Sequence, residues 1–328
     1  MSKRRISHQQ SHRIHQKQSR YQQRAASTSP ETLSEGLVIK RYSRLALIED
    51  HRGQQLRCAI RPDIQSLVAG DRVIWQPEGQ ENGVVLSVLP RRSVLNRPDF
   101  RGLLKPVAAN ITQVMIVIAP IPDISWTLLD SYLVMTESLH IPACIVLNKT
   151  DLACEDAKER LETLYKPMNY TIVYVSRDND AQQAELMNAL NGQTSVFVGQ
   201  SGVGKSSIIS RILPQDDSII TGDVSEQTQL GRHTTSNSCL YHLTGGGHLI
   251  DSPGVREFGL SDMPIRNLAE GFREFRPYIT ACQFRNCNHQ NVPGCAVIKA
   301  LQQNEISRVR YDSYVKLALK FSEISRPH

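Results

Sequence analysis

The 328-residue sequence contains no run close to the eighteen or so apolar residues that a membrane-spanning helix needs, and its basic amino terminus has no apolar core like that of a secretory signal. We therefore expect a cytoplasmic protein that neither spans nor binds a membrane. Its seven cysteines lack the dense spacing of a disulfide framework, which fits a reducing compartment. Hydrophobic residues still make up 40% of the chain, enough for the cores of two or three domains.

Acidic residues are missing from the start of the chain. None precedes Glu31, whereas seven lysines and arginines lie between positions 3 and 24, among many Gln, Ser and His residues. This composition predicts a disordered basic arm over residues 1–35. Such an arm binds nucleic acid by neutralising phosphates, with an affinity that depends on salt and not on sequence. A tail that only improves solubility is the alternative.

Short strand-like runs separated by Gly and Asp turns follow the arm. They lie at residues 36–40, 45–48, 56–60, 72–75 and 83–89. Five such strands in about 55 residues predict a small β-barrel of the OB type over residues 36–95, a fold that binds RNA along one face. A barrel without a ligand is the alternative. We expect the basic residues within 91–98 to form a connector that extends the binding surface.

A glycine-rich motif of the form GxxxxGKS follows a buried-strand pattern at 194–198 and precedes a helical pattern at 206–213. At this position glycines let backbone N–H groups approach phosphates, and the helix amino terminus adds partial positive charge. Lys205 would reach the β- and γ-phosphates, and the Ser206 hydroxyl would bind Mg²⁺. The predicted phosphate-binding residues are Gly199, Gln200, Ser201, Gly202, Val203, Gly204, Lys205, Ser206 and Ser207.

The tetrapeptide Asn-Lys-Thr-Asp at 148–151 follows another apolar strand pattern. The Asp151 carboxylate can accept hydrogen bonds from the ring N–H and the amine of guanine, and adenine lacks both donors. Asn148 would hold the loop, and the stem of Lys149 would cover the base. Ser176, at the end of a later strand pattern, is a weaker candidate for a backbone contact to guanine. These residues predict a preference for GTP over ATP.

The order of these two motifs is unusual, because ordinary GTPases place the guanine motif after the phosphate loop and here it comes about fifty residues before it. Strand and helix patterns alternate around both motifs, which is typical of a doubly wound α/β sheet. Since chain ends usually lie close together in a domain, joining them and opening the chain elsewhere preserves the core. The sequence therefore predicts a circularly permuted P-loop GTPase domain over residues 96–262.

A DxxG motif completes the predicted site. Asp251 would reach Mg²⁺, commonly through water, and the Gly254 N–H would meet the γ-phosphate. Val255 stands where many GTPases carry a glutamine that orients the attacking water, and an aliphatic side chain cannot do this.

Another residue must then position the water, and the segment Gly-Arg-His-Thr-Thr at 231–235 contains candidates. His233 could orient or deprotonate water near neutral pH, although chemistry alone does not distinguish it from an exposed loop residue. Thr235, or alternatively Thr234, would complete the Mg²⁺ shell.

The last part of the chain contains a CxxxxCxHxxxxxC pattern. Three thiolates and one imidazole make a closed tetrahedral set that suits one structural zinc ion per chain and leaves no position open for catalysis. A thiol-rich loop without metal is the alternative. The predicted ligands are Cys282, Cys287, His289 and Cys295.

Helical patterns at 264–275, 295–303 and 306–322 surround this cluster, so we expect a helical zinc-binding domain over residues 263–328. Basic residues of the last pattern, including Arg308, Arg310, Lys316 and Lys320, are expected to form a solvated helix surface.

Taken together, the barrel, NKTD, GQSGVGKS, GRHTT, DSPGVREFG and the Cys-Cys-His-Cys cluster resemble the ribosome small subunit-dependent GTPase A family (RsgA) over nearly the whole chain beyond the first thirty-five residues. The resemblance implies a slow GTPase that is strongly stimulated by the small ribosomal subunit and acts in its late maturation. Its expected partners are that subunit and its rRNA, and it would use Mg²⁺ with GTP. It also implies that His233 is the catalytic histidine. Ser236 stands where many members have a third threonine.

Two other functions are weighed against a monomeric GTPase of this kind. The chain could be an RNA-binding scaffold in which the nucleotide is a structural or regulatory ligand, but Lys205, Ser206 and Asp251 argue for hydrolysis. It could also be a P-loop ATPase or kinase, against which Asp151 argues. Our hypothesis is that the GTP form docks on the subunit near its decoding region, hydrolysis is triggered there, and the GDP form leaves.

Overall fold

The computed structural model describes residues 33–64, 66–79, 81–98, 103–213, 238–251 and 265–324. The chain divides into two compact units. The first contains residues 1–111, 234–241 and 249–254, and the second contains residues 112–233, 242–248 and 255–328. Within the described ranges, no helix is both long and apolar enough to cross a membrane.

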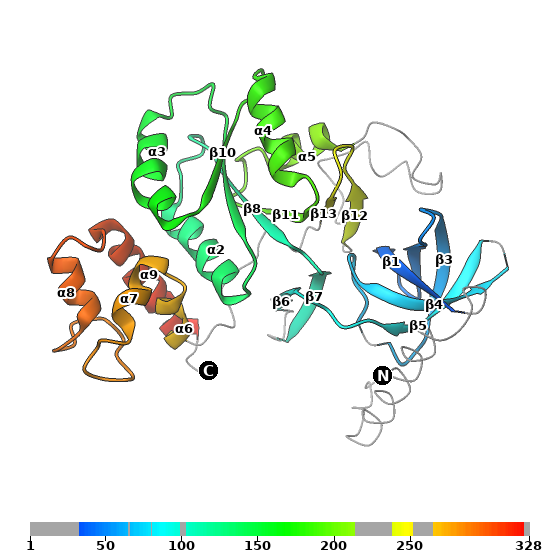
Figure 1. The fold of residues 1–328 in the computed structure, drawn as a ribbon, viewed down its shortest axis with the longest axis horizontal. Helices are drawn as coiled ribbons and strands as arrows, with labels where there is room; N and C mark the ends of the chain where they lie inside the picture. The colour runs from blue at the N-terminus through cyan, green and yellow to red at the C-terminus, as the bar shows by residue number, and fades with distance from the viewer. Residues whose placement is uncertain are drawn as a thin grey trace. The chain divides into compact units, whose positions relative to one another are not determined.

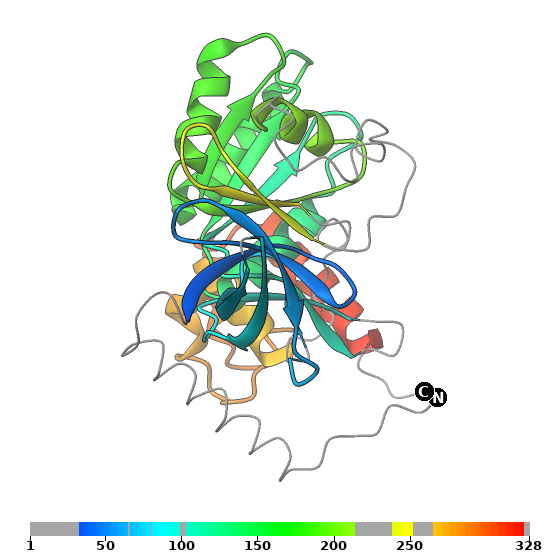
Figure 2. The same ribbon diagram turned by 90° about the vertical axis from the view of Figure 1, so that its right-hand side faces the viewer.

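A closed barrel forms most of the first unit. Its strands are β1 (Ser34–Arg41), β2 (Leu45–Glu49), β3 (Gln55–Ile60), β4 (Arg72–Glu78) and β5 (Asn82–Val88). Strand β1 pairs with both β2 and β4, β3 pairs with β2 and in parallel with β5, and β4 pairs with β5, so no strand has a free edge. Figure 2 shows these strands, blue to cyan, curling round one another. The predicted OB-type barrel is confirmed.

The interior of the barrel explains why these strands form. Apolar side chains on one face of each strand, such as Val38, Ile48, Cys58 and Trp75, are buried together in its core. Burial raises the pKa of the Cys58 thiol to about 12, which keeps it neutral in this apolar setting.

The basic segment after the barrel is not the connector that we expected. It forms β6 (Val94–Pro98), which pairs antiparallel with β7 (Leu104–Ala109) and runs across the predicted boundary between residues 95 and 96. Leu95 and Ala108 are opposite each other and fully buried. Arg91 also differs from the expectation, because its guanidinium binds both oxygens of the buried Asp71 carboxylate at 2.7 and 2.8 Å.

The second unit contains a parallel sheet. Its strands are β8 (Gln113–Ile118), β9 (Ala143–Asn148), β10 (Thr171–Val175) and β11 (Thr194–Val198), in the order β10-β9-β8-β11. Its helices are α2 (Trp126–Ser138), α3 (Glu155–Arg160), α4 (Asp180–Leu190) and α5 (Lys205–Ile212). Figure 1 shows α2 and α3 on one side of this sheet and α4 and α5 on the other. Because both faces are covered, β8 and β9 are almost entirely apolar and buried. The predicted doubly wound fold is confirmed.

Two short strands precede the predicted DxxG motif, whose first residue, Asp251, ends the second of them. These are β12 (Cys239–His242) and β13 (His248–Asp251), which are neighbours in the sheet order. Within the first unit, β12 also pairs antiparallel with barrel strand β1, with Lys40 opposite Cys239.

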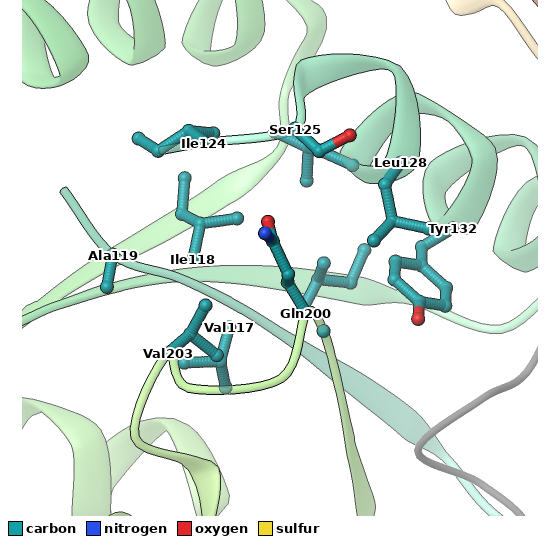
Figure 3. A pocket seen from close by; sticks show the side chains of 12 residues that line it. Val117, Ile118, Ala119, Ile124, Ser125, Leu128, Tyr132, Gln200 and Val203 are labelled. Atoms are coloured by element: carbon teal, nitrogen blue, oxygen red, sulfur yellow. The ribbon is translucent and has the colours of Figure 1, made fainter. Parts of the chain in front are cut away.

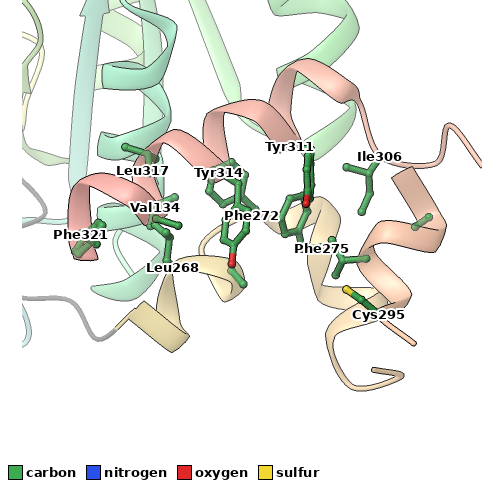
Figure 4. Close-up of a cluster of buried hydrophobic side chains, with 14 residues drawn as sticks. Val134, Leu268, Phe272, Phe275, Cys295, Ile306, Tyr311, Tyr314, Leu317 and Phe321 are labelled. Atoms are coloured by element: carbon green, nitrogen blue, oxygen red, sulfur yellow. The ribbon is translucent and has the colours of Figure 1, made fainter. Parts of the chain in front are cut away.

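The chain ends in a group of helices. They are α6 (Ile265–Glu270), a 3₁₀ turn η4 (Arg273–Phe275), α7 (Arg276–Ile279), α8 (Ala296–Gln302) and α9 (Arg308–Ile324). Figure 4 shows their shared core, in which Val134 of α2 lies among Leu268, Leu317 and Phe321.

Two details of these helices correct the sequence-based expectations. The helix expected over 264–275 is interrupted at Gly271, where a Cβ atom would lie only 2.5 Å from Val134. The expected solvated basic face is present at Arg308, Lys316 and Lys320, but Arg310 is 2% exposed. Both differences arise from tertiary contacts, which local sequence patterns do not contain.

Candidate nucleotide site and metal centre

The predicted guanine and phosphate motifs meet at one edge of the parallel sheet. Strand β9 ends at Asn148, β11 ends at Val198, and β8 lies between them. Since the three strands are parallel, the loops that follow β9 and β11 leave the sheet at the same edge, where open α/β sheets bind ligands. Val175, the last residue of β10, is paired with Asn148, so Ser176 also follows at this edge.

The phosphate motif has the geometry of a P-loop. Lys205 is the first residue of α5 and is 7% exposed, and its Nζ donates hydrogen bonds to the carbonyl oxygens of Gly199 at 2.7 Å and Gln200 at 2.6 Å. Gly199 must be glycine because its φ is +140° and a Cβ would lie 2.2 Å from the Val117 carbonyl oxygen. The loop therefore places Lys205 at a helix amino terminus, where an anion is favoured.

Direct hydrogen bonds join the guanine motif to the P-loop. The Asn148 side-chain amide donates to the Val203 carbonyl oxygen at 2.9 Å and is 8% exposed. Lys149 has a φ of +59°, and its Nζ donates at 2.8 Å to the carbonyl oxygens of Gly202 and Ile121. Through these bonds Asn148 and Lys149 join the loop after β9 to the P-loop.

The remaining predicted side chains of this edge differ in exposure. Asp151 is exposed, as is Ser207, whereas Ser206 is half-buried in the first turn of α5. Ser176 is 7% exposed, and its carbonyl oxygen accepts a hydrogen bond from the Gln183 side chain at 2.6 Å. Ile121 contributes a backbone carbonyl, which no sequence pattern can predict.

A small cavity separates the P-loop from α2. Its volume is about 10 Å³, room for about one water molecule, so it is not the nucleotide site. Figure 3 shows the Gln200 side chain pointing toward Ser125, with Leu128 and Tyr132 of α2 beside it. Side chains from the first turns of α2 and residues of the P-loop thus line the same cavity.

The other predicted site residues are only partly described. Asp251 is half-buried and is the last residue of β13. His233, Thr235 and Gly254 lie outside the described residues, as do Thr234, Val255 and Ser236.

The four predicted metal ligands lie together, with their ligand atoms all within 4.8 Å of one another. A tetrahedral zinc ion with Zn–S distances of about 2.3 Å and a Zn–N distance of about 2.0 Å sets two sulfurs about 3.8 Å apart and sulfur about 3.5 Å from nitrogen. The Sγ atoms of Cys282 and Cys295 are 3.9 Å apart, and the His289 Nδ1 lies 3.6 and 3.5 Å from them. The cluster can therefore hold a metal ion, with Nδ1 as the histidine ligand.

Protonation in the cluster follows from its burial. His289 is 3% exposed, and burial lowers its pKa, which favours the neutral imidazole that a metal requires. Burial, with the neighbouring Cys287 and Cys282 side chains, raises the pKa of the Cys295 thiol to about 12. A divalent cation stabilises thiolates, so metal binding would release protons from this site.

Two tyrosines of α9, which the sequence pattern did not single out, support the metal loop. The Tyr311 hydroxyl donates to the His289 carbonyl oxygen, and the Tyr314 hydroxyl donates to the Asn288 carbonyl oxygen, each at 2.7 Å. Both rings are buried in the core of the helical group. Because residues three apart lie on the same face of a helix, this spacing could have indicated that both tyrosines contact one loop.

Known proteins share this arrangement. The sequence model of a family described as RsgA GTPase matches residues 88–261. A protein of Haemophilus influenzae (strain 86-028NP) named "Small ribosomal subunit biogenesis GTPase RsgA" is 41% identical over 98% of this chain and 97% of its own length. A protein of the same name from Dickeya dadantii (strain 3937) is 41% identical over 99% of this chain and 97% of its own length.

Solved structures agree with the sequence matches. The crystal structure of YjeQ from Thermotoga maritima has a TM-score of 0.75 at 30% identity and covers 90% of this chain and 100% of its own. That of YloQ, described as a circularly permuted GTPase, has a TM-score of 0.72 at 27% identity, covering 90% of this chain and 97% of its own. With the guanine motif ahead of the P-loop and hydrogen-bonded to it, the chain is a GTPase and belongs to the RsgA family of circularly permuted GTPases.

Proposed function

We propose that this chain is a GTP hydrolase that binds the small ribosomal subunit and assists its late maturation, with hydrolysis stimulated by the subunit and coupled to release. The observation that carries the proposal is the match, over 98% of the chain, to a relative named for biogenesis of that subunit. A closed OB-type barrel in the same chain supplies a surface of the kind that binds RNA. The proposal includes a monomer that works in the cytoplasm.

The geometry of the sheet edge supports the nucleotide contacts that we propose. The P-loop residues 199–207 would surround the phosphates, with Lys205 shared between loop carbonyls and phosphate oxygens. Asp151 would accept hydrogen bonds from guanine, and Ser176 would contribute a backbone contact. Specificity for guanine then rests on Asp151, because adenine would leave this carboxylate without donors.

The catalytic proposal concerns the segments around β12 and β13. Ser206, Thr235 and Asp251 would hold Mg²⁺, which neutralises charge on the phosphates. Gly254 would donate its N–H to the γ-phosphate, and His233 would position the attacking water in place of the glutamine that Val255 replaces.

We propose zinc as the metal at Cys282, Cys287, His289 and Cys295, one ion per chain. The support is the donor set, whose three sulfurs and one nitrogen suit zinc, and the sulfur and nitrogen separations of 3.5 to 3.9 Å. Four protein ligands leave no open position, so the role would be structural.

The pairing of β12 with β1 supports a route from nucleotide to RNA. Strand β12 follows the segment that contains Thr235, and Lys40 of barrel strand β1 is paired with Cys239 at its start. A change of the switch segment on hydrolysis would therefore act on a strand that is hydrogen-bonded to the barrel. This is how we propose that loss of the γ-phosphate weakens subunit binding.

Co-sedimentation with purified small subunits tests the proposal. The chain should sediment with small subunits in the presence of a non-hydrolysable GTP analogue and remain largely in the supernatant with GDP. Large subunits serve as the control and should retain little of either form. Equal binding with the analogue, with GDP and without nucleotide would instead favour the RNA-binding scaffold.

A further inference from the structure

Helix α2 connects the nucleotide site with the C-terminal helices. The helix begins at Trp126, and the segment that leads into it contains Ile121, whose carbonyl oxygen accepts the 2.8 Å hydrogen bond from Lys149. A Cβ on Gly202 of the P-loop would be 3.4 Å from Pro122. The segment that leads into α2 therefore contacts both nucleotide-binding loops.

The other end of α2 is held by the C-terminal helices. Glu137 accepts hydrogen bonds from Arg273 at 2.7 Å and Arg276 at 2.6 Å. Although burial would raise the pKa of Glu137, the hydrogen bonds from the two arginines lower it below its usual value, so the carboxylate stays charged. Val134, one turn earlier, is fully buried against the same helices.

The middle of α2 carries a buried ion pair. Asp130 is 1% exposed and forms a salt bridge with Arg310 of α9, which is 2% exposed. Arg310 also binds both oxygens of Glu274, at 2.6 and 3.3 Å. The Tyr165 hydroxyl donates to the same Asp130 oxygen at 2.9 Å. Because Tyr165 ends the helical turn that continues α3, the pair also holds the element that follows the guanine motif.

Arg310 lies on the helix that supports the metal loop. Its neighbour Tyr311, and Tyr314 one turn later, bind the backbone around His289, while Arg310 itself reaches α2. One continuous helix of 17 residues thus contacts the metal loop and the buried carboxylate. Its contact with α2 through Asp130 is made by side chains that are almost completely buried.

We propose that the Arg310–Asp130 pair is a positioning link, through which the C-terminal helices hold α2 and residues 121–122 against the nucleotide-binding loops and thereby slow the release of GDP. A buried charge that loses its partner cannot remain where it is without cost, so removal of Arg310 moves or loosens α2. The Ile121 carbonyl then no longer fixes Lys149 beside the base. The inference rests only on nucleotide binding and is independent of the ribosomal subunit.

Stopped-flow release of a fluorescent GDP from the full chain, without ribosomal subunits, tests the link. Arg310→Met should accelerate release about 5-fold or more, the lower end of typical coupling between sites. Arg308→Met is the matched control, since Arg308 lies on the same helix with its side chain 75% exposed and should leave the rate unchanged. Arg310→Lys keeps the charge but cannot bind both carboxylates with a planar fork, so its rate should fall between those of wild type and Arg310→Met.

A loss of domain stability must be separated from a loss of the link. Val297→Ala removes methyl groups from the same core without touching the polar contacts to α2, and it should lower the unfolding midpoint without changing GDP release. Folded Arg310→Met that releases GDP at the wild-type rate would overturn the proposal, as would equal acceleration by Val297→Ala. If circular dichroism shows that Arg310→Met does not fold, Arg310→Lys takes its place, because it changes the same pair with Asp130. Faster release by this variant supports the link, and an unchanged rate refutes it.

Discussion

Replacing Gly204 by alanine tests whether the guanine motif and the P-loop act as one unit. Gly204 precedes Lys205 with a φ of +95°, and a Cβ there would lie 2.3 Å from the side-chain nitrogen of Asn148. Alanine in this backbone region costs about 1–2 kcal/mol. The Asn148 amide must also leave the Val203 carbonyl oxygen, and an unsatisfied buried acceptor costs about 1–3 kcal/mol more.

Gly192 supplies the matched control because its φ is +70° and no described atom lies within 4 Å of a Cβ there. Gly192→Ala therefore has the backbone cost without the displacement of Asn148. The P-loop without nucleotide can relax around an alanine at position 204, but it must return to its original geometry to bind nucleotide. The additional cost of about 1–3 kcal/mol therefore makes the free energy of nucleotide binding less favourable. This predicts GDP binding about 5- to 150-fold weaker than in Gly192→Ala, measured by isothermal titration calorimetry. A folded Gly204→Ala protein that binds GDP as tightly as Gly192→Ala would refute the reasoning.

Three further predictions concern the proposed site residues. Asp151→Asn should weaken GDP binding and relax the preference for guanine over adenine, on the scale of about 1–3 kcal/mol for a bidentate base contact, and an unchanged GDP affinity by calorimetry would remove Asp151 from the site. Cys287→Ala should lose the single zinc ion and the fold of the C-terminal helices, since structural zinc contributes folding energy. The control Cys154→Ala should keep its zinc. Metal analysis that finds no zinc in the wild-type chain purified without chelators would contradict this prediction. His233→Ala should bind GTP normally yet lose about 10²–10⁴-fold of its subunit-stimulated turnover and remain on the subunit in the GTP state, and turnover at the wild-type rate would assign the water to another residue.

Local sequence patterns predicted the positions of the strands and helices better than they predicted which strands pair with each other. The barrel strands lie within a few residues of their expected positions, because alternation and Gly or Asp turns are properties of neighbouring residues. The pairings of β1 with β4 and of β3 with β5, which close the barrel, join residues far apart in the sequence. Hairpin β6-β7 was missed for a different reason, because each of its strands contains a proline, Pro98 or Pro106, which weakens the strand pattern.

At the nucleotide site and the metal cluster, too, local patterns identified side chains but not their backbone partners. The motifs identified Lys205, Asn148 and the metal ligands from spacing alone, and the structure brings the first two together at one sheet edge and the ligands into one cluster. Backbone acceptors have no sequence signature, so the Ile121 contact to Lys149 was out of reach.

Arg310 shows how burial can reverse an interpretation from composition. In a basic helix it was expected to face solvent, but the opposing carboxylates Asp130 and Glu274 lie far away in the sequence. From the sequence alone, loss of Cys287 is expected to spare nucleotide binding. The link through Arg310 predicts instead that the same loss accelerates GDP release, because α9 would no longer hold α2.

GTP turnover measured with and without purified small ribosomal subunits tests the central claim most directly. The proposed function predicts slow hydrolysis by the chain alone, strong stimulation by small subunits, little stimulation by large subunits, and no comparable turnover of ATP. Turnover that small subunits leave unchanged, in a chain that binds GTP and sediments with those subunits, would contradict the claim that hydrolysis is coupled to the subunit.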